Sequence, residues 1–250
     1  MSLPPEAEGA PPRDGHADAH AGEPPWGPGV AVAIFAGCTI AASVVAIPFV
    51  ALLGEDLAIT LPVLEVLMLV ALWWVIGTHY GQEGYEALLA PEPERASPPI
   101  RSWVLAASAA AGLFVIDLVV QGVVTAAGVD VSDVQREIRD VLLGGPVVGS
   151  FAVLTVVLFA PVVEELFFRG LLFQGFARRW GAGAASLMSS VIFAAFHIEP
   201  TAVGTVLVVG SAFLLGLVSC WLFMRTRTLL APVALHVFTN AAATVELYIR

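Results

Sequence analysis

The stretch PVVEELFFRG, residues 161–170, decides how the rest of the chain is interpreted. It places two adjacent carboxylates and a guanidinium inside an apolar run that covers roughly residues 147–176. Charged groups at membrane depth are costly and face a protein interior or a wet cavity, so they indicate a functional site. On a helix, Glu165 and Arg169 are four residues apart and can form an ion pair. Glu164 points about 100° further round the helix, which leaves its carboxylate available as a general base.

The composition predicts an integral membrane protein. Of the 250 residues, 58% are hydrophobic and 13% are charged, and the mean hydropathy is +0.87. In soluble domains about a quarter of the residues are charged, well above the 13% of this chain. The net charge of −10 and the lack of a basic stripe argue against nucleic acid as a partner. We therefore expect membrane lipids to surround most of the chain.

The lengths and positions of the apolar segments predict an all-α, polytopic transmembrane helix bundle. Residues 1–28 are acidic and rich in Pro and Gly, which is typical of a disordered tail. A membrane helix needs about 20 apolar residues. Seven segments satisfy this, near residues 30–53, 57–78, 102–128, 147–177, 182–197, 201–224 and 229–248. Pro161 removes a backbone hydrogen bond, and a break there would make an eighth span.

The segments between the spans set the expected orientation. We expect a polar loop at 79–101 and a short amphipathic surface helix within 129–145. With seven spans and a cytoplasmic N-terminus, most arginines fall on the cytoplasmic side: Arg95, Arg101, Arg178, Arg179, Arg225 and Arg227. The bias favours a multi-pass protein of the cell membrane with its N-terminus inside.

Other polar residues within the predicted membrane spans have ordinary structural explanations. Glu65 follows Pro62, so we expect it in the first turn of a helix, where a carboxylate suits the helix dipole. Asp117 and Gln121 lie four residues apart, which fits a hydrogen bond between helices or, as the second interpretation, a polar pathway.

Three motifs on successive hydrophobic segments resemble a known family. They are Glu164-Glu165-x-x-x-Arg169, Phe193-x-x-x-His197 and His236-x-x-x-Asn240. In this order they resemble the CPBP family, which includes the CAAX prenyl endopeptidases and the bacterial Abi-type membrane proteases. The resemblance covers about residues 150–245, so residues 146–250 would form the catalytic core and residues 29–145 additional N-terminal membrane helices.

The resemblance implies an intramembrane endopeptidase that acts on a peptide of a membrane-associated or lipidated protein. Glu164 would be the catalytic glutamate, His197 and His236 its partners, and Asn240 the oxyanion group. The residues themselves suit this chemistry, because a carboxylate in a poorly hydrated cavity accepts protons more readily than one in water. Asn240 and a histidine can donate to a developing oxyanion. Glu165 and Arg169 would hold the helix and the charge balance. No cofactor is expected.

Two alternatives use the same side chains. His197 and His236 could bind zinc together with a glutamate, although the chain has no His-Glu-x-x-His motif. A transporter or an interaction protein could instead use Glu164, Asp117 and His197 as an ion or proton path.

Overall fold

The computed structural model describes residues 24–53, 57–90 and 92–249. Within these ranges the regular structure is entirely helical. Six helical elements of the described residues are long and apolar enough to cross a membrane. They are Pro28–Leu52, Ile59–Arg95, Pro99–Ala126, Pro146–Ala195, Ala202–Thr226 and Leu230–Ile249. The chain is an integral membrane protein, and the expected count of seven or eight spans is not confirmed.

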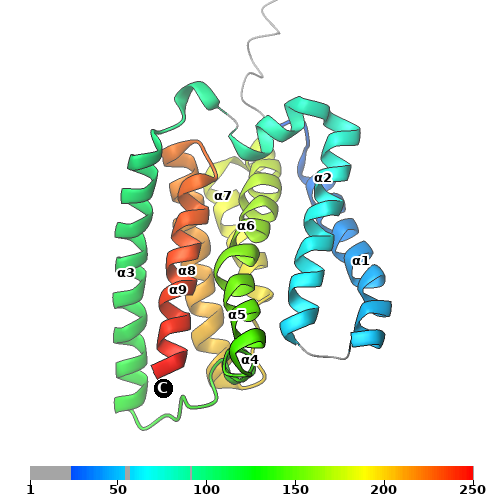
Figure 1. Cartoon of the computed structure of the whole chain (residues 1–250). Helices are drawn as coiled ribbons and strands as arrows, with labels where there is room; N and C mark the ends of the chain where they lie inside the picture. Colours follow the sequence, from blue (N-terminus) through cyan, green and yellow to red (C-terminus); the bar gives the residue numbers. More distant parts are fainter. Residues whose placement is uncertain (1–23, 54–56, 91, 250) are drawn as a thin grey trace, which may run out of the picture.

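The longest of these elements is a helical hairpin. It comprises α5 (Pro146–Leu154), the π-helical η3 (Thr155–Phe159), α6 (Ala160–Glu165), the π-helical η4 (Leu166–Phe173) and α7 (Gln174–Ala195). Gly181 interrupts α7 with φ 76° and ψ 165°, a conformation that glycine adopts without a steric penalty. The Ser189 hydroxyl donates to the Phe168 carbonyl at 2.8 Å, although a straight helix would separate these residues by about 30 Å. The chain therefore turns back at Gly181 (Figure 1).

Pro161 does not break this hairpin. It lies in the first turn of α6, and the two residues before it, Phe159 and Ala160, keep right-handed helical backbone angles. The irregularity is instead the π-helical η3 directly before it. An eighth span that begins at Pro161 is therefore absent from the described hairpin.

The first two helices pack against each other and against the hairpin. They are α1 (Pro28–Leu53) and α2 (Leu57–Leu89). The expected polar loop at 79–101 is wrong for its first part, because α2 continues to Leu89 after a break at Gly81, where φ is 57° and ψ is −145°. Past the break, the Tyr85 hydroxyl donates to the Trp73 carbonyl at 2.9 Å and the two rings stack. Gly81 therefore changes the direction of the helix without ending it.

The remaining helices complete the bundle on the other side of the hairpin. In Figure 1, α3 (Pro99–Ala126) and α9 (Leu230–Ile249) run side by side, with α8 (Ala202–Thr226) behind α9. The amphipathic stretch at 129–145 forms only a short helix, α4 (Arg136–Leu142). Leu142 is buried there against Ala152 and Leu247, as its apolar spacing predicts.

The start of the described chain is anchored in the core. The Trp26 ring is fully buried, and its Nε1 donates to the Leu171 carbonyl of η4 at 3.1 Å. The tail that the sequence delimits at residue 28 therefore ends earlier, and residues 1–23 lie outside the described residues. Gly175 is required for this contact, because a Cβ there would lie 2.7 Å from Cβ of Ala31 and 3.3 Å from Cδ1 of Trp26.

The two ends of the bundle are each tied together by hydrogen bonds. At one end, Ser97 N donates to Thr226 O at 2.8 Å and Leu229 N donates to Leu89 O at 3.1 Å. A short helix, η2 (Pro93–Arg95), lies at this end. Arg178 donates there to the Pro24 carbonyl. At the opposite end, the Tyr248 hydroxyl donates to the Leu142 carbonyl at 3.0 Å. The start of α1, Arg178 of α7 and the end of α8 therefore share one end.

Candidate active site

The site is built on the turn of α6 that continues into η4. Glu164 and Glu165 are the last residues of α6, and Arg169 lies within η4. π-Helical turns are rare and occur frequently at functional sites. Every residue of η4 is buried, so this turn is held on all sides by packing. A rigid surround of this kind fixes the direction of each charged side chain.

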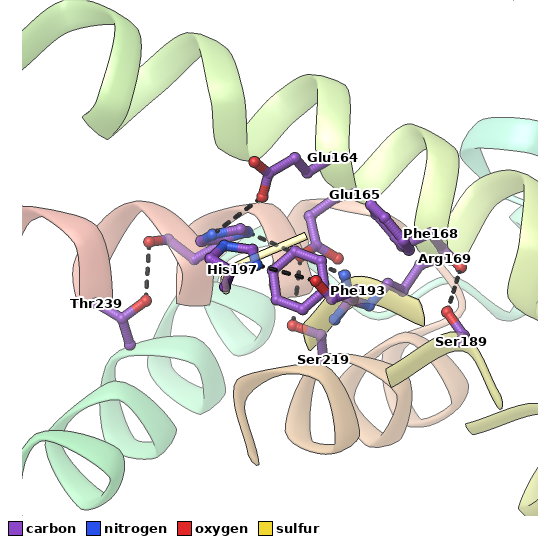
Figure 2. Close-up of polar contacts among 10 residues, drawn as sticks. Glu164, Glu165, Phe168, Arg169, Ser189, Phe193, His197, Ser219 and Thr239 are labelled. Atoms are coloured by element: carbon purple, nitrogen blue, oxygen red, sulfur yellow. Dashed lines mark hydrogen bonds and ion pairs between the residues drawn. The ribbon is translucent and has the colours of Figure 1, made fainter. Parts of the chain in front are cut away.

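Glu165 and Arg169 form a fully buried ion pair, as their spacing predicts. Their charged atoms lie 3.0 Å apart and both side chains have 0% exposure. The guanidinium carbon also lies 4.8 Å from the centre of the Phe193 ring, within the range of a cation–π contact. Among the described residues, the Arg169 nitrogens make no hydrogen bond of good geometry. Charge attraction and the aromatic face therefore hold the guanidinium (Figure 2).

His236 on α9 joins the two glutamates. Its Nδ1 lies 3.0 Å from Glu165 Oε1, and its Nε2 lies 3.6 Å from Glu164 Oε2. Glu165 is ionised beside Arg169 and can only accept, so Nδ1 carries the hydrogen of the neutral ring. The Nε2 lone pair then faces Glu164. The lone pair and the carboxylate both accept hydrogen bonds, so a donor such as water fits between them.

Glu164 is the accessible member of the pair of carboxylates. Its side chain is 25% exposed, whereas that of Glu165 is 0% exposed. Figure 2 shows Glu164 and Glu165 leaving the same helix in different directions, with only Glu165 directed at Arg169. The distance of 3.6 Å to His236 is longer than a hydrogen bond and suits a water that contacts both groups. The division between a braced and an available glutamate therefore has a structural basis.

Asn240 lies one turn after His236 and binds the backbone of the hairpin. Its Nδ2 donates to the Val156 carbonyl at 2.8 Å. In the π-helical η3 the next available donor for that carbonyl would be the amide five residues on, but this residue is Pro161, which has none. Asn240 therefore satisfies a carbonyl that Pro161 leaves open. The second hydrogen of the amide remains for a ligand.

His197 is set apart from the glutamates by an aromatic ring. Its Nδ1 contacts the Phe193 carbonyl at 2.9 Å, which leaves Nε2 directed elsewhere. The Phe193 ring packs against both histidines, with ring centres 4.6 Å from His197 and 5.6 Å from His236. The structure thus gathers His197 into the same neighbourhood, but the contacts it describes for this side chain are with Phe193.

A cavity of about 510 Å³ opens beside these side chains. Its walls come from α3, α8 and α9 and from the segment before α4. His197, His236 and Asn240 line it, whereas Glu164 is reached through His236. The volume lies within the range of small-molecule and peptide sites in proteins. The histidines and the amide therefore face a space that can hold a ligand.

Comparison with known proteins identifies this part of the chain. Residues 146–242 match the model of the family described as type II CAAX prenyl endopeptidase Rce1-like. This region is similar to the Rce1-like family. The resemblance to the CPBP family is therefore confirmed over these residues, which include each of the site residues named above.

The comparison with curated proteins covers a similar share of the chain. A protein of Escherichia coli described as an uncharacterized 24.3 kDa protein is 32% identical over 103 residues. These residues are 40% of this chain and 42% of that protein, so the alignment spans less than half of either. No solved structure matches the chain.

The Rce1-like region offers no ready set of metal ligands. Within the described ranges, no group of three or more His, Cys, Asp or Glu side chains has a metal-holding arrangement. His236, which the zinc alternative requires, has one ring nitrogen on Glu165 and the other facing Glu164.

Three further residues belong to the site: the sequence indicates Phe193 only as part of a motif and Glu65 only as a residue with a structural role, and it does not single out Ser219. Ser219 on α8 lies 3.5 Å from Glu165 Oε1 and supports the braced glutamate. Phe193 covers Arg169 as well as both histidines. Glu65 is the third, and the expectation of a first-turn position is wrong because α2 begins at Leu57, two turns earlier. Its Oε2 is buried without a hydrogen bond among the described residues, and its helix α2 packs against α6, which carries Glu164.

Proposed function

We propose that this chain is an intramembrane endopeptidase that hydrolyses a peptide bond of a membrane-associated or lipidated substrate. The observation that carries the proposal is the His236 ring between an accessible and a braced glutamate, beside a cavity that Asn240 also lines. The match of residues 146–242 to a peptidase family supports the same reaction class. The substrate enters from the bilayer or its surface, because the surrounding helices are apolar.

In this mechanism Glu164 is the general base. A water between Glu164 and His236 loses its proton to Glu164 as its oxygen attacks the scissile carbonyl. Glu165 and Arg169 keep the His236 ring in one orientation, so Nε2 always faces the reacting water. Glu164 then returns the proton to the leaving amine, which completes the hydrolysis. The reaction consumes one water and forms a new carboxyl and a new amino terminus.

The oxyanion is stabilised by a neutral donor at the cavity wall. Asn240 has one amide hydrogen on the Val156 carbonyl and a second one for the developing charge. His197 lines the same cavity, but its Nδ1 donates to the Phe193 carbonyl, so its Nε2 can accept a hydrogen bond from the substrate. Donors that are fixed before the reaction begins stabilise the transition state without reorganisation.

Asn240 provides a test of this assignment. Asn240→Ala is expected to lower kcat by about 10²–10³-fold and to leave KM nearly unchanged, because the contact strengthens only in the transition state. Asn240→Asp is expected to be at least as damaging, since it sets a negative charge against the oxyanion. The measurement is kcat and KM on one cleavable peptide. A change confined to KM would make Asn240 a substrate-binding group instead.

We propose that the reaction needs no resident metal. Treatment with chelator, followed by assay in metal-free buffer, is expected to leave kcat within about twofold of the untreated value, because Glu164 and His236 supply the base. Elemental analysis of the same purified sample is the control. Stoichiometric zinc that is lost together with activity in His197→Ala would establish the metal mechanism.

The arginine distribution supports one orientation of the protein. Six arginines belong to the end at which α1 begins: Arg95, Arg101, Arg178, Arg179, Arg225 and Arg227. Arg136 and Arg139 belong to the opposite end, with α4. Since cytoplasmic loops carry an excess of basic residues, we place the start of α1 on the cytoplasmic side of the cell membrane.

A further inference from the structure

The cavity beside the Rce1-like site has an unusual combination of walls. Most of the residues that line it are apolar, among them Leu113, Val120, Leu207 and Phe213. The fixed charges in its walls are the carboxylates of Asp117 and Glu246, and no arginine is among the described residues that line it. An apolar chamber whose charged groups are all carboxylates attracts a ligand with an apolar body and a positive charge.

Asp117 is held in a fixed position in this wall. The Ser211 hydroxyl on α8 donates to Oδ1 at 2.8 Å, and Gln121 Nε2 donates to Oδ2 at 2.8 Å. Both donors are neutral, so the carboxylate keeps its charge attraction for a cation. Each carboxylate oxygen accepts more than one hydrogen bond, so a third donor can be bound from the cavity. The contact with Ser211 also confirms the hydrogen bond between helices expected for Asp117.

The cavity is long enough for several residues of a peptide. His236 and Glu246 both line it and lie on α9, which separates them by about 15 Å along the helix axis. This length accommodates about four or five residues of an extended chain. A substrate bound at His236 and Asn240 can therefore extend as far as Glu246 within the cavity that Asp117 also lines.

From these observations we infer that the substrate is a peptide whose apolar segment carries one basic side chain, and that Asp117 binds this side chain within about five residues of the scissile bond. The inference rests on the proposed peptidase function and names its substrate class. Asp117 on this view determines specificity and takes no part in bond cleavage. A charge-assisted hydrogen bond in a poorly hydrated wall is stronger than a neutral one, which makes it an effective selector.

The test uses the full-length protein in detergent and a set of apolar peptides with blocked termini. Each peptide carries either lysine or its uncharged isostere norleucine at one variable position. This position is moved over the five residues on either side of the cleaved bond, and the rest of the peptide stays the same. We expect lysine to raise kcat/KM by about tenfold or more at one or two of these places. A third set with norleucine and a free N-terminus distinguishes a lysine side chain from a terminal ammonium.

The matched variants are Asp117→Asn and, as the control, Asp140→Asn on the exposed side of α4. Asp117→Asn keeps the size of the side chain and is expected to abolish the preference for lysine, whereas Asp140→Asn is expected to retain it. Equal kcat/KM values for lysine and norleucine in the wild-type protein would overturn the inference, and this comparison requires no variant to fold. A lysine preference that persists in folded Asp117→Asn would overturn it as well.

A binding measurement separates this inference from the proposed function. Fluorescently labelled peptides are titrated into Glu164→Gln, which is expected to bind substrate without cleaving it. If the wild-type protein cleaves none of the peptides, the peptidase proposal is contradicted, but tighter binding of lysine peptides that depends on Asp117 would still support the cation site. Cleavage without any effect of charge on rate or binding would contradict the cation site alone.

Discussion

Glu164→Gln is expected to lower kcat by about 10²–10⁴-fold, the contribution of a general base, while the protein remains folded. The amide keeps the shape of the side chain but cannot accept the proton of water. Because the Glu164 side chain is 25% exposed and is not the partner of Arg169, its neutralisation leaves no buried charge behind. The measurement is kcat on one cleavable peptide, together with the thermal unfolding midpoint in the same detergent.

The control for this variant is Glu94→Gln, which makes the same chemical change at an exposed residue of η2. It is expected to keep wild-type kcat. Glu164→Gln protein that is folded and retains more than about a tenth of wild-type kcat would contradict the role of Glu164 as the base.

Glu165→Gln is expected to destabilise the fold by about 3–5 kcal/mol, because it leaves Arg169 charged and buried without its partner. Both side chains have 0% exposure, so water cannot replace the lost contact. The change also leaves Nδ1 of His236 with a neutral amide oxygen in place of the carboxylate as its acceptor. The measurement is the thermal unfolding midpoint, and Glu164→Gln at the neighbouring position is the matched control.

A second variant distinguishes a lost ion pair from a general packing defect. Removing both charges, with Glu165→Gln and Arg169→Gln together, is expected to be less destabilising than Glu165→Gln alone, since no unpaired charge remains. Equal losses of stability in Glu164→Gln and Glu165→Gln would contradict the division of roles between the two glutamates.

The local features of the site were predictable from the sequence because they depend on positions within one helix. The spacing of Glu165 and Arg169 fixes their contact on any helix, and the different direction of Glu164 follows from the same geometry. The membrane class followed from composition, and most helices followed from hydrophobic length. These inferences use neighbouring residues only.

The features that were missed depend on how helices rotate and pack against each other. The sequence does not indicate how deep His236 lies relative to the two glutamates, which it contacts in the structure. Its depth depends on where α9 sits relative to α6, which no local pattern encodes. The role of Glu65 was missed for the same reason, because its proximity to Glu164 is set by the packing of α2 on α6.

One missed feature had a signal in the sequence. Pro161 lacks the amide that would bind a carbonyl in the preceding turn, so a partner for that carbonyl was to be expected. Asn240 is that partner, through Val156. Asn240, the expected oxyanion residue, thus also has a structural contact. Its replacement is therefore tested by separate values of kcat and KM, because a loss of activity alone would not distinguish the two roles. The continuation of α2 past Gly81 had no comparable signal.

The central claim is that the Glu164–His236–Glu165 arrangement hydrolyses a peptide bond with water. The most direct measurement is mass spectrometry of a cleavable peptide incubated with the purified protein in water enriched in ¹⁸O. We predict that the wild-type protein releases a fragment whose new carboxyl group carries one ¹⁸O atom and that folded Glu164→Gln does not. An uncleaved peptide library with folded wild-type protein, or equal ¹⁸O incorporation by Glu164→Gln, would contradict the account.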